Sequence, residues 1–138
     1  MAITKNNTRM LDGSIDITSQ VTGYEQGTFT PVANDFSGTV TFSNVMYTRI
    51  GNIVHYSFKM SGKSNTADTS QIAISGFPFQ VVGEHPASVG INSSSFGHAM
   101  LNTAEILYFY ITSGGAFTYD DFPHTSGYAR VQGSYFIS

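Results

Sequence analysis

The clearest hydrophobic pattern lies in Ile53–Met60, where apolar and mostly polar residues alternate. One set is Val54, Tyr56, Phe58 and Met60, and the other is Ile53, His55, Ser57 and Lys59. A period of two predicts a β-strand with one face on a core and the other facing solvent or a partner. Gly51-Asn52 precedes this stretch and suits the positive φ of a tight hairpin turn. We therefore predict a β-hairpin at the centre of an all-β domain.

Further β-rich runs recur about every ten residues, separated by Gly, Pro, Ser and Asn. The predicted strands are Gly38–Phe42, Val45–Ile50, Ile53–Ser61, Thr69–Ile74, Ala87–Ser94, Ile106–Thr112 and Tyr128–Ile137, with a further short strand at Ala116–Tyr119. Helical periodicity is weak, and only Gly97–Ile106 is a helix candidate. Short strands at this spacing predict an antiparallel, jelly-roll-like β-sandwich over residues 28–138.

Residues 1–27 have a different pattern, because turn formers separate apolar residues that are too spread out for a core of their own. We predict an extended N-terminal arm that is ordered against other chains; the alternative is an ordinary flexible terminus. The first residues, MAITKNNTRML, contain no apolar run long enough for a signal peptide or a membrane span. We therefore expect synthesis in the cytoplasm without a signal peptide and no membrane insertion.

Composition narrows the choice of partners. Hydrophobic residues make up 41% of the 138 residues and charged residues only 11%, so the surface must be built from uncharged polar groups. Such surfaces are typical of extracellular and viral β proteins. The net charge is −3, with scattered Lys and Arg, which argues against nucleic acid as a partner. The absence of cysteine excludes disulfides and cysteine-based zinc sites.

Motifs for catalysis or metal binding are missing from the chain. The four histidines occur singly, and there is neither a GxSxG sequence nor a glycine-rich phosphate loop, so we expect no metal and no cofactor. Asp120-Asp121 is the one pair of adjacent carboxylates. We interpret it either as a solvated turn or as a loop that binds Ca²⁺ or sugar hydroxyls. A polysaccharide depolymerase that uses two separated carboxylates stays open, although nothing marks its members.

The aromatic residues are more informative than the charged ones. In Ile106–Ile111, Tyr108 and Tyr110 share one face, where they serve either the core, a subunit interface or stacking against sugar rings. Tyr119 belongs to a second polar-aromatic stretch that includes the two aspartates. The candidate glycan-binding residues are Tyr108, Tyr110, Tyr119, Asp120, Asp121 and His124.

Three phrases occur in a characteristic order: Gly27-Thr28-Phe29-Thr30-Pro31, then Tyr47-Thr48-Arg49-Ile50-Gly51-Asn52-Ile53-Val54, then Ile74-Ser75-Gly76-Phe77-Pro78-Phe79. In these phrases the chain resembles a domain near the C-termini of bacteriophage tail fibres and tailspikes. Two departures are the phenylalanine in the first phrase, where those domains usually have tryptophan, and the absence of a long shaft. The resemblance implies a β-sandwich and a homotrimer without catalytic residues.

These observations lead to a first hypothesis: the chain is a non-enzymatic, trimeric virion protein that recognises bacterial surface glycan. Its partners would be copies of itself, the glycan, and other virion or tail proteins bound through residues 1–27. The alternative hypothesis is a purely structural virion protein, either a trimerising cap or a decoration protein anchored by its N-terminal arm. The two hypotheses differ in whether the isolated protein binds glycan.

Overall fold

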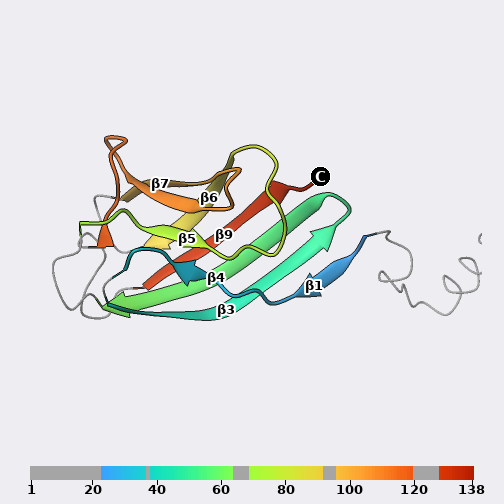
Figure 1. Cartoon of the computed structure of the whole chain (residues 1–138), viewed down its shortest axis with the longest axis horizontal. Coiled ribbons are helices and arrows are strands. Elements are labelled where there is room, and N and C mark those ends of the chain that lie inside the picture. Colours follow the sequence, from blue (N-terminus) through green and yellow to red (C-terminus); the bar gives the residue numbers. More distant parts are fainter. Residues whose placement is uncertain (1–22, 37, 64–68, 92–95, 120–127) are drawn as a thin grey trace, which may run out of the picture.

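The computed structural model describes residues 23–36, 38–63, 69–91, 96–119 and 128–138. Within these residues nine strands form one antiparallel sheet in the order β1-β3-β4-β9-β6-β7-β8-β5-β2 (Figure 1). Their bounds are β1 Glu25–Gly27, β2 Val32–Ala33, β3 Thr39–Ile50, β4 Ile53–Lys63, β5 Ala73–Ser75, β6 His85–Ile91, β7 Phe96–Leu101, β8 Leu107–Ile111 and β9 Tyr128–Phe136.

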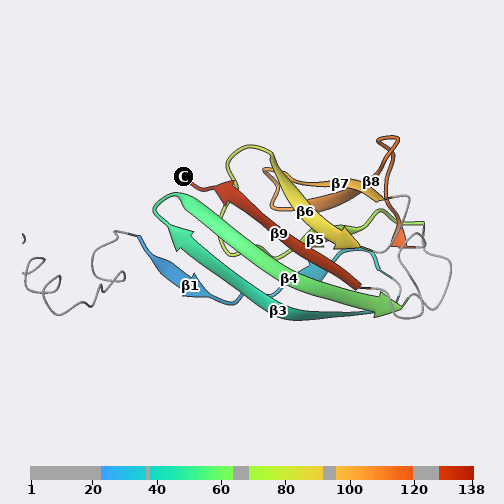
Figure 2. The same cartoon turned by 180° about the vertical axis from the view of Figure 1, so that it is seen from behind.

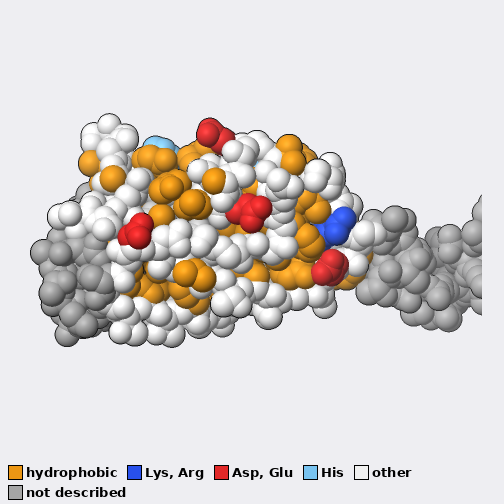
Figure 3. All heavy atoms as spheres, in the orientation of Figure 1, with side chains coloured by type: hydrophobic (Ala, Val, Ile, Leu, Met, Phe, Trp, Pro, Cys, Tyr) orange, Lys and Arg blue, Asp and Glu red, His pale blue; other side chains and the backbone are white. Residues whose placement is uncertain are grey.

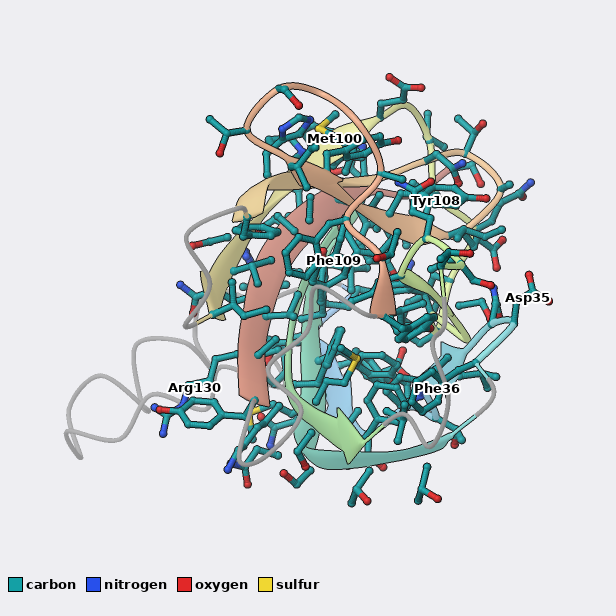
Figure 4. The ribbon with its side chains drawn as sticks, turned by 90° about the vertical axis from the view of Figure 1, so that its left-hand side faces the viewer. Asp35, Phe36, Met100, Tyr108, Phe109 and Arg130 are labelled. Carbon is teal, nitrogen blue, oxygen red and sulfur yellow. The ribbon has the colours of Figure 1, made fainter. Side chains whose placement is uncertain are left out.

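The sheet is strongly curled into a half-barrel, and Figure 4, which looks roughly along the strands, shows the curl with Phe109 on its inside. The all-β antiparallel prediction is therefore confirmed. Hydrogen-bonded pairing runs without a break from β1 at one edge to β2 at the other, so the structure does not divide clearly into the two sheets of a sandwich.

The predicted central hairpin is confirmed. Ile50 pairs with Ile53, and of the two turn residues only Gly51 has a positive φ, 62°, as in a type II′ turn. The two strands expected before the turn are one strand, β3. Its pairing with β4 shifts register between Ser43 and Met46, next to Asn44 with its φ of 53°. A β-bulge thus replaces the predicted break between strands.

The helix candidate Gly97–Ile106 is wrong, because most of it forms β7, which pairs with both β6 and β8. A turn follows, in which the Asn102 side-chain oxygen accepts hydrogen bonds from the backbone N–H groups of Ala104 and Ile106. The expected strand at Ala116–Tyr119 is present only as isolated bridges, between Ala116 and Tyr110 and between Thr118 and Gln71. Short strands of this kind leave no periodic signal.

The predicted N-terminal arm lies mostly in residues 1–22, outside the described residues. Its last part contains β1, which pairs with the outer edge of β3 through Glu25 to Arg49 and Gly27 to Tyr47. The side chains also meet, because the Tyr47 hydroxyl donates a 2.5 Å hydrogen bond to Glu25. Residues 25–27 are therefore part of the sheet.

The core fills the inside of the curl. The predicted alternation in β4 is confirmed, since its four apolar inward residues are between 0% and 4% exposed. Five rings form an aromatic cluster with neighbouring centroids 5.0 to 6.4 Å apart: Phe29, Tyr56, Phe58, Phe77 and Tyr135. Aromatic contacts at these distances add to the free energy gained by burial.

The three sequence phrases contact one another at and beside this cluster. Phe29 of the first phrase stacks on Phe77 of the third at 5.6 Å. Tyr47 of the second packs edge-on against Phe79 of the third at 5.4 Å. Gly76 has a φ of 89°, and a Cβ there would lie 2.2 Å from the Thr30 carbonyl oxygen, so only glycine fits. The phrases therefore specify packing inside the curl.

Candidate functional site

A concavity lies on the outer face of the sheet, across β3, β4, β9 and β6. It is an open depression of about 810 Å³, which we call the outer trough. Its outward side chains are Met46, Thr48, His55, Ser57, Pro86, Ser88, Gln132 and Ser134. Figure 2 shows these four strands side by side, with no other labelled strand in front of them.

Strand register brings these side chains together. One row across the sheet runs from Met46 through Ser57 and Gln132 to Ser88. The parallel row runs from Thr48 through His55 and Ser134 towards Pro86, which lies beside the Ala87–Gly133 pair. Each row takes residues from four strands that are far apart in the sequence. The trough is therefore a product of the sheet topology.

The lining offers both hydrogen-bond donors and acceptors and contains no Asp, Glu, Lys or Arg. Hydroxyl, amide and imidazole groups each can donate or accept. Within the trough, His55 Nδ1 and the Ser134 hydroxyl oxygen are 2.7 Å apart and share a hydrogen bond. Such a surface is suited to a ligand rich in hydroxyl groups.

The outer face differs at the two ends of the trough. At one end are exposed apolar side chains: Ile50 is 44% exposed, Val82 48% and Phe136 49%. Phe136 pairs with Ile53 in β4 and bridges to Val82, so these groups are contiguous. We call this patch the apolar end.

At the other end, Lys59 of β4 lies directly opposite Arg130 of β9. The Lys59 ammonium nitrogen is 4.7 Å from the centroid of the Tyr128 ring, and the Arg130 guanidinium carbon is 5.6 Å from it. Figure 4 shows Arg130 on the outside of the curl. We call these three residues the cationic end.

Two of the predicted site residues lie on the same outer face, two strands beyond β6. Tyr108 pairs with Met100 across β7 and β8, and both are near the surface (Figure 4). Tyr110 stacks on His98, with centroids 4.8 Å apart and the rings 12° from parallel. Their neighbour Phe109 is fully buried, so β8 presents its two tyrosines on the outer face. From the sequence alone, the core, a subunit interface and sugar stacking were all open for this pair.

Tyr119 is placed differently from the expectation. It is 3% exposed, it packs on Phe36 at 4.3 Å, and its hydroxyl donates to the Asn34 carbonyl oxygen at 3.2 Å. The ring is thus part of the core, because residues 117–119 pair with residues 70–72: the Ile72 N–H donates to the Phe117 carbonyl oxygen, and the Tyr119 N–H donates to the Ser70 carbonyl oxygen. The other three predicted residues, Asp120, Asp121 and His124, lie outside the described residues.

The described histidines have different partners. His55 contacts Ser134, His98 stacks on Tyr110, and the Nε2 of His85 is 2.6 Å from the Val82 carbonyl oxygen. Among the described residues, no group of three His, Cys, Asp or Glu side chains is placed to hold a metal ion. No described helix is long and apolar enough to span a membrane.

Buried and hydrogen-bonded tyrosines have shifted acidity. Burial raises the pKa of Tyr56 and Tyr135 far above the ordinary value of 10.0. The Tyr56 hydroxyl has no hydrogen-bond partner among the described residues. The hydrogen bond to Glu25 raises the pKa of Tyr47, because the neighbouring carboxylate disfavours a phenolate. None of these hydroxyls is placed as a base at neutral pH.

Comparisons with protein-family models, with curated proteins and with solved structures found no match to this chain. The protein is therefore described by its own fold and site. It is an all-β chain built on one curled antiparallel sheet, and the trough on the outer face of that sheet has no charged side chain in its lining. Figure 3 shows the opposite side, where hydrophobic side chains lie among uncharged polar ones and charged side chains are few.

Sequence reasoning missed most of the trough. It identified the polar face of β4, including His55 and Ser57, as facing solvent or a partner, but it did not pair that face with β9 and β6. Gln132 and Ser134 alternate with the buried Val131 and Tyr135, and this alternation was the available signal. The pairing partners carried no signal of their own, because sheet order is a long-range property.

Proposed function

We propose that this chain is a non-enzymatic, homotrimeric virion protein of the tail fibre or tailspike type, which binds bacterial surface glycan through the outer face of its sheet. The outer trough carries this proposal. It is open and lined by hydroxyl, amide and imidazole groups, whereas sites for small apolar ligands are enclosed and mostly apolar. An extended polar chain such as a glycan fits that shape and chemistry.

The tyrosines of β8 extend the surface available to a glycan. Adjacent strands are about 4.8 Å apart, so Tyr108 and Tyr110 lie roughly 10 Å from β6 along the sheet. Ring faces at that spacing offer stacking beyond the polar trough. In a trimer, three such surfaces on one tip would raise avidity without strong individual sites.

The apolar end supports the trimer. Exposed apolar patches mark interaction surfaces more often than isolated exposed residues do, and Ile50, Val82 and Phe136 form such a patch. We further propose that the curled sheet acts as the equivalent of the jelly-roll-like sandwich in this family of tips, with the aromatic cluster between its two halves. The virion location and the role of residues 1–27 as an attachment segment belong to the same proposal.

A non-enzymatic role is proposed because the lining of the trough contains no carboxylate. Hydrolysis of glycosides generally needs two carboxyl groups that flank the scissile bond. Incubation with host polysaccharide tests this point. Release of reducing ends would contradict it.

The second candidate is a structural virion protein, a trimerising cap or decoration protein held by its N-terminal arm. The apolar end favours this candidate as well, since it provides a contact surface without requiring a glycan. Deletion of residues 1–22 tests the arm: loss of particle attachment with the oligomer retained would support anchoring.

Light scattering followed by a glycan array on the same sample separates the candidates. We expect a mass of about three times 14.9 kDa and binding to bacterial surface glycans. A trimer that binds no glycan would favour the structural candidate. A monomer would contradict the trimeric tip altogether.

A further inference from the structure

Positive charge is concentrated at one place on the described surface. Three lysine and arginine side chains are described, those of Arg49, Lys59 and Arg130, and two of the three form the cationic end. The whole chain has a net charge of −3, so this pairing is not the result of a generally basic surface.

The two cations face each other directly across β4 and β9. Like charges in such a cross-strand pair destabilise a sheet. Neither cation has a carboxylate partner or a hydrogen bond among the described residues. Contacts with one shared ring, that of Tyr128, hold them in place and offset part of the repulsion.

The cationic end continues the outer trough. Along β4, Lys59 follows Ser57 on the same face, and along β9, Arg130 precedes Gln132 on the same face. Same-face neighbours are about 7 Å apart along a strand. Across the next strand, Arg130 is opposite Gly90, which has no side chain, and a Cβ there would meet nothing within 4 Å among the described residues. Arg130 itself is exposed.

We propose that Lys59, Arg130 and Tyr128 form an anion-binding subsite that gives the trough a preference for acidic sugars, meaning glycans that carry carboxylate or phosphate groups. The ammonium and guanidinium N–H groups would donate charge-assisted hydrogen bonds to the anion. The anion would also remove the repulsion between the two cations. The Tyr128 ring pre-organises both donors. This inference rests on glycan binding as the proposed function.

Nuclear magnetic resonance titration of the full, isotope-labelled chain tests the subsite. The probes are glucuronate, inorganic phosphate and, as the uncharged control, glucose. We expect saturable shifts at Tyr128, Arg130 and Lys59 with glucuronate and phosphate. Lys59→Gln or Arg130→Gln should weaken that binding about tenfold, the effect of losing one charge-assisted hydrogen bond.

Arg49→Gln is the matched control, because it removes one positive charge at the other end of the sheet, where Arg49 lies over Phe79. It should leave anion binding unchanged. Tyr128→Leu keeps both charges and removes the ring, and weaker binding is expected there too. Equal binding in the wild type and in Lys59→Gln/Arg130→Gln, or no saturable shift with either anion, would overturn the proposal.

A glycan array with acidic oligosaccharides and their carboxyl-reduced counterparts separates this inference from the proposed function. Stronger binding of the acidic members, lost in Lys59→Gln/Arg130→Gln, supports both. Equal binding of acidic and neutral members keeps the glycan function and overturns the subsite. If the protein binds phosphate and glucuronate but no oligosaccharide on the array, both the acidic-sugar assignment and the glycan function are overturned.

Discussion

The inner and outer faces of the same four strands, β3, β4, β9 and β6, have different chemistry. On the inner face of β4 every second side chain is 4% exposed or less, and the neighbouring rings form the aromatic cluster. On the outer face the alternate positions carry His55, Ser57, Gln132 and Ser134, which line an open trough. One face therefore carries the free energy of folding, and the other is free to serve binding.

The three sequence phrases that led to the tail fibre hypothesis make their aromatic contacts on the inner side of the sheet. Their residues pack against one another around Phe29, Phe77 and Phe79. These contacts hold the segment before β2, strand β3 and the segment after β5 together. The trough residues Gln132 and Ser88 lie outside all three phrases, so the phrases carry no information about a ligand.

The largest expected loss of stability comes from removing the Phe77 ring from the inner face of the sheet. This ring is 6% exposed and contacts Phe29, Tyr56 and Tyr135. Phe77→Ala should lower the free energy of unfolding by about 3–5 kcal/mol, through lost burial and the cavity that remains. Urea denaturation measures it, with Met46→Ala, at 57% exposure on the outer face, as the control. A cost below 1 kcal/mol would show that the aromatic cluster is not the main support of the sheet.

A smaller loss is expected at Gly133, which lies under the Tyr56 ring. A Cβ at residue 133 would be 2.6 Å from the Tyr56 hydroxyl oxygen, so Gly133→Ala should cost about 1–3 kcal/mol by overpacking. Gly90→Ala is the matched control in a neighbouring strand, because a Cβ there meets nothing within 4 Å. Tyr56→Phe should recover part of the loss in the double variant, which a double-mutant cycle measures. Equal costs at the two glycines would contradict this packing.

Alkaline pH probes the inner face without mutation. Burial raises the pKa of Tyr56 in the folded state, while in the unfolded chain the pKa is the ordinary 10.0. Below pH 10 the hydroxyl is protonated in both states and the free energy of unfolding is unaffected. Above pH 10 the unfolded chain loses this proton first, so the free energy of unfolding falls as the pH rises. Stability should fall by up to about 1.4 kcal/mol per pH unit for this residue. The free energy of unfolding of Tyr56→Phe should fall less steeply with pH than that of the wild type. At pH 7 this variant should be at least as stable as the wild type, because it buries no unpaired hydroxyl. An unchanged slope in Tyr56→Phe would contradict the assignment.

The smallest effect on stability is expected on the outer face. Gln132→Ala should change the free energy of unfolding by no more than about 0.5 kcal/mol, as is usual for exposed positions. Its effect on glycan affinity should be up to about tenfold, the value of one hydrogen bond. Calorimetric unfolding and a binding titration on one sample measure both. A large loss of stability with unchanged binding would reverse the roles assigned to the two faces.

The hairpin and the strand faces could be predicted from sequence because they depend on local signals. Gly51-Asn52 predicted the turn, and alternation identified the buried face of β4. In β8, alternation placed Tyr108 and Tyr110 on one face but did not say which face is buried. The bulge at Asn44 was read as a break between strands, since a turn-forming residue gives the same signal in both cases. The candidate helix became β7 because pairing with β6 and β8 overrode a weak local pattern.

The site was harder to predict than the fold. Tyr119 was expected at a surface but is buried against Phe36. Its position depends on pairing with residues 70–72 and on contacts with Asn34 and Phe36, which are distant in the sequence. The trough joins residues from position 46 to position 134, and no local pattern reports such a pairing. The cationic end likewise depends on the register that places Lys59 opposite Arg130.

Whether the outer trough binds glycan can be tested by filling it with a large side chain. Ser88→Trp places a large side chain in the trough from an exposed position of β6, while Ser113→Trp makes the same change at an exposed turn outside it. Glycan-array binding is measured for both variants and the wild type at equal oligomeric mass. We expect Ser88→Trp to lose binding and Ser113→Trp to keep it. Glycan binding that survives in Ser88→Trp would show that the trough is not the binding site.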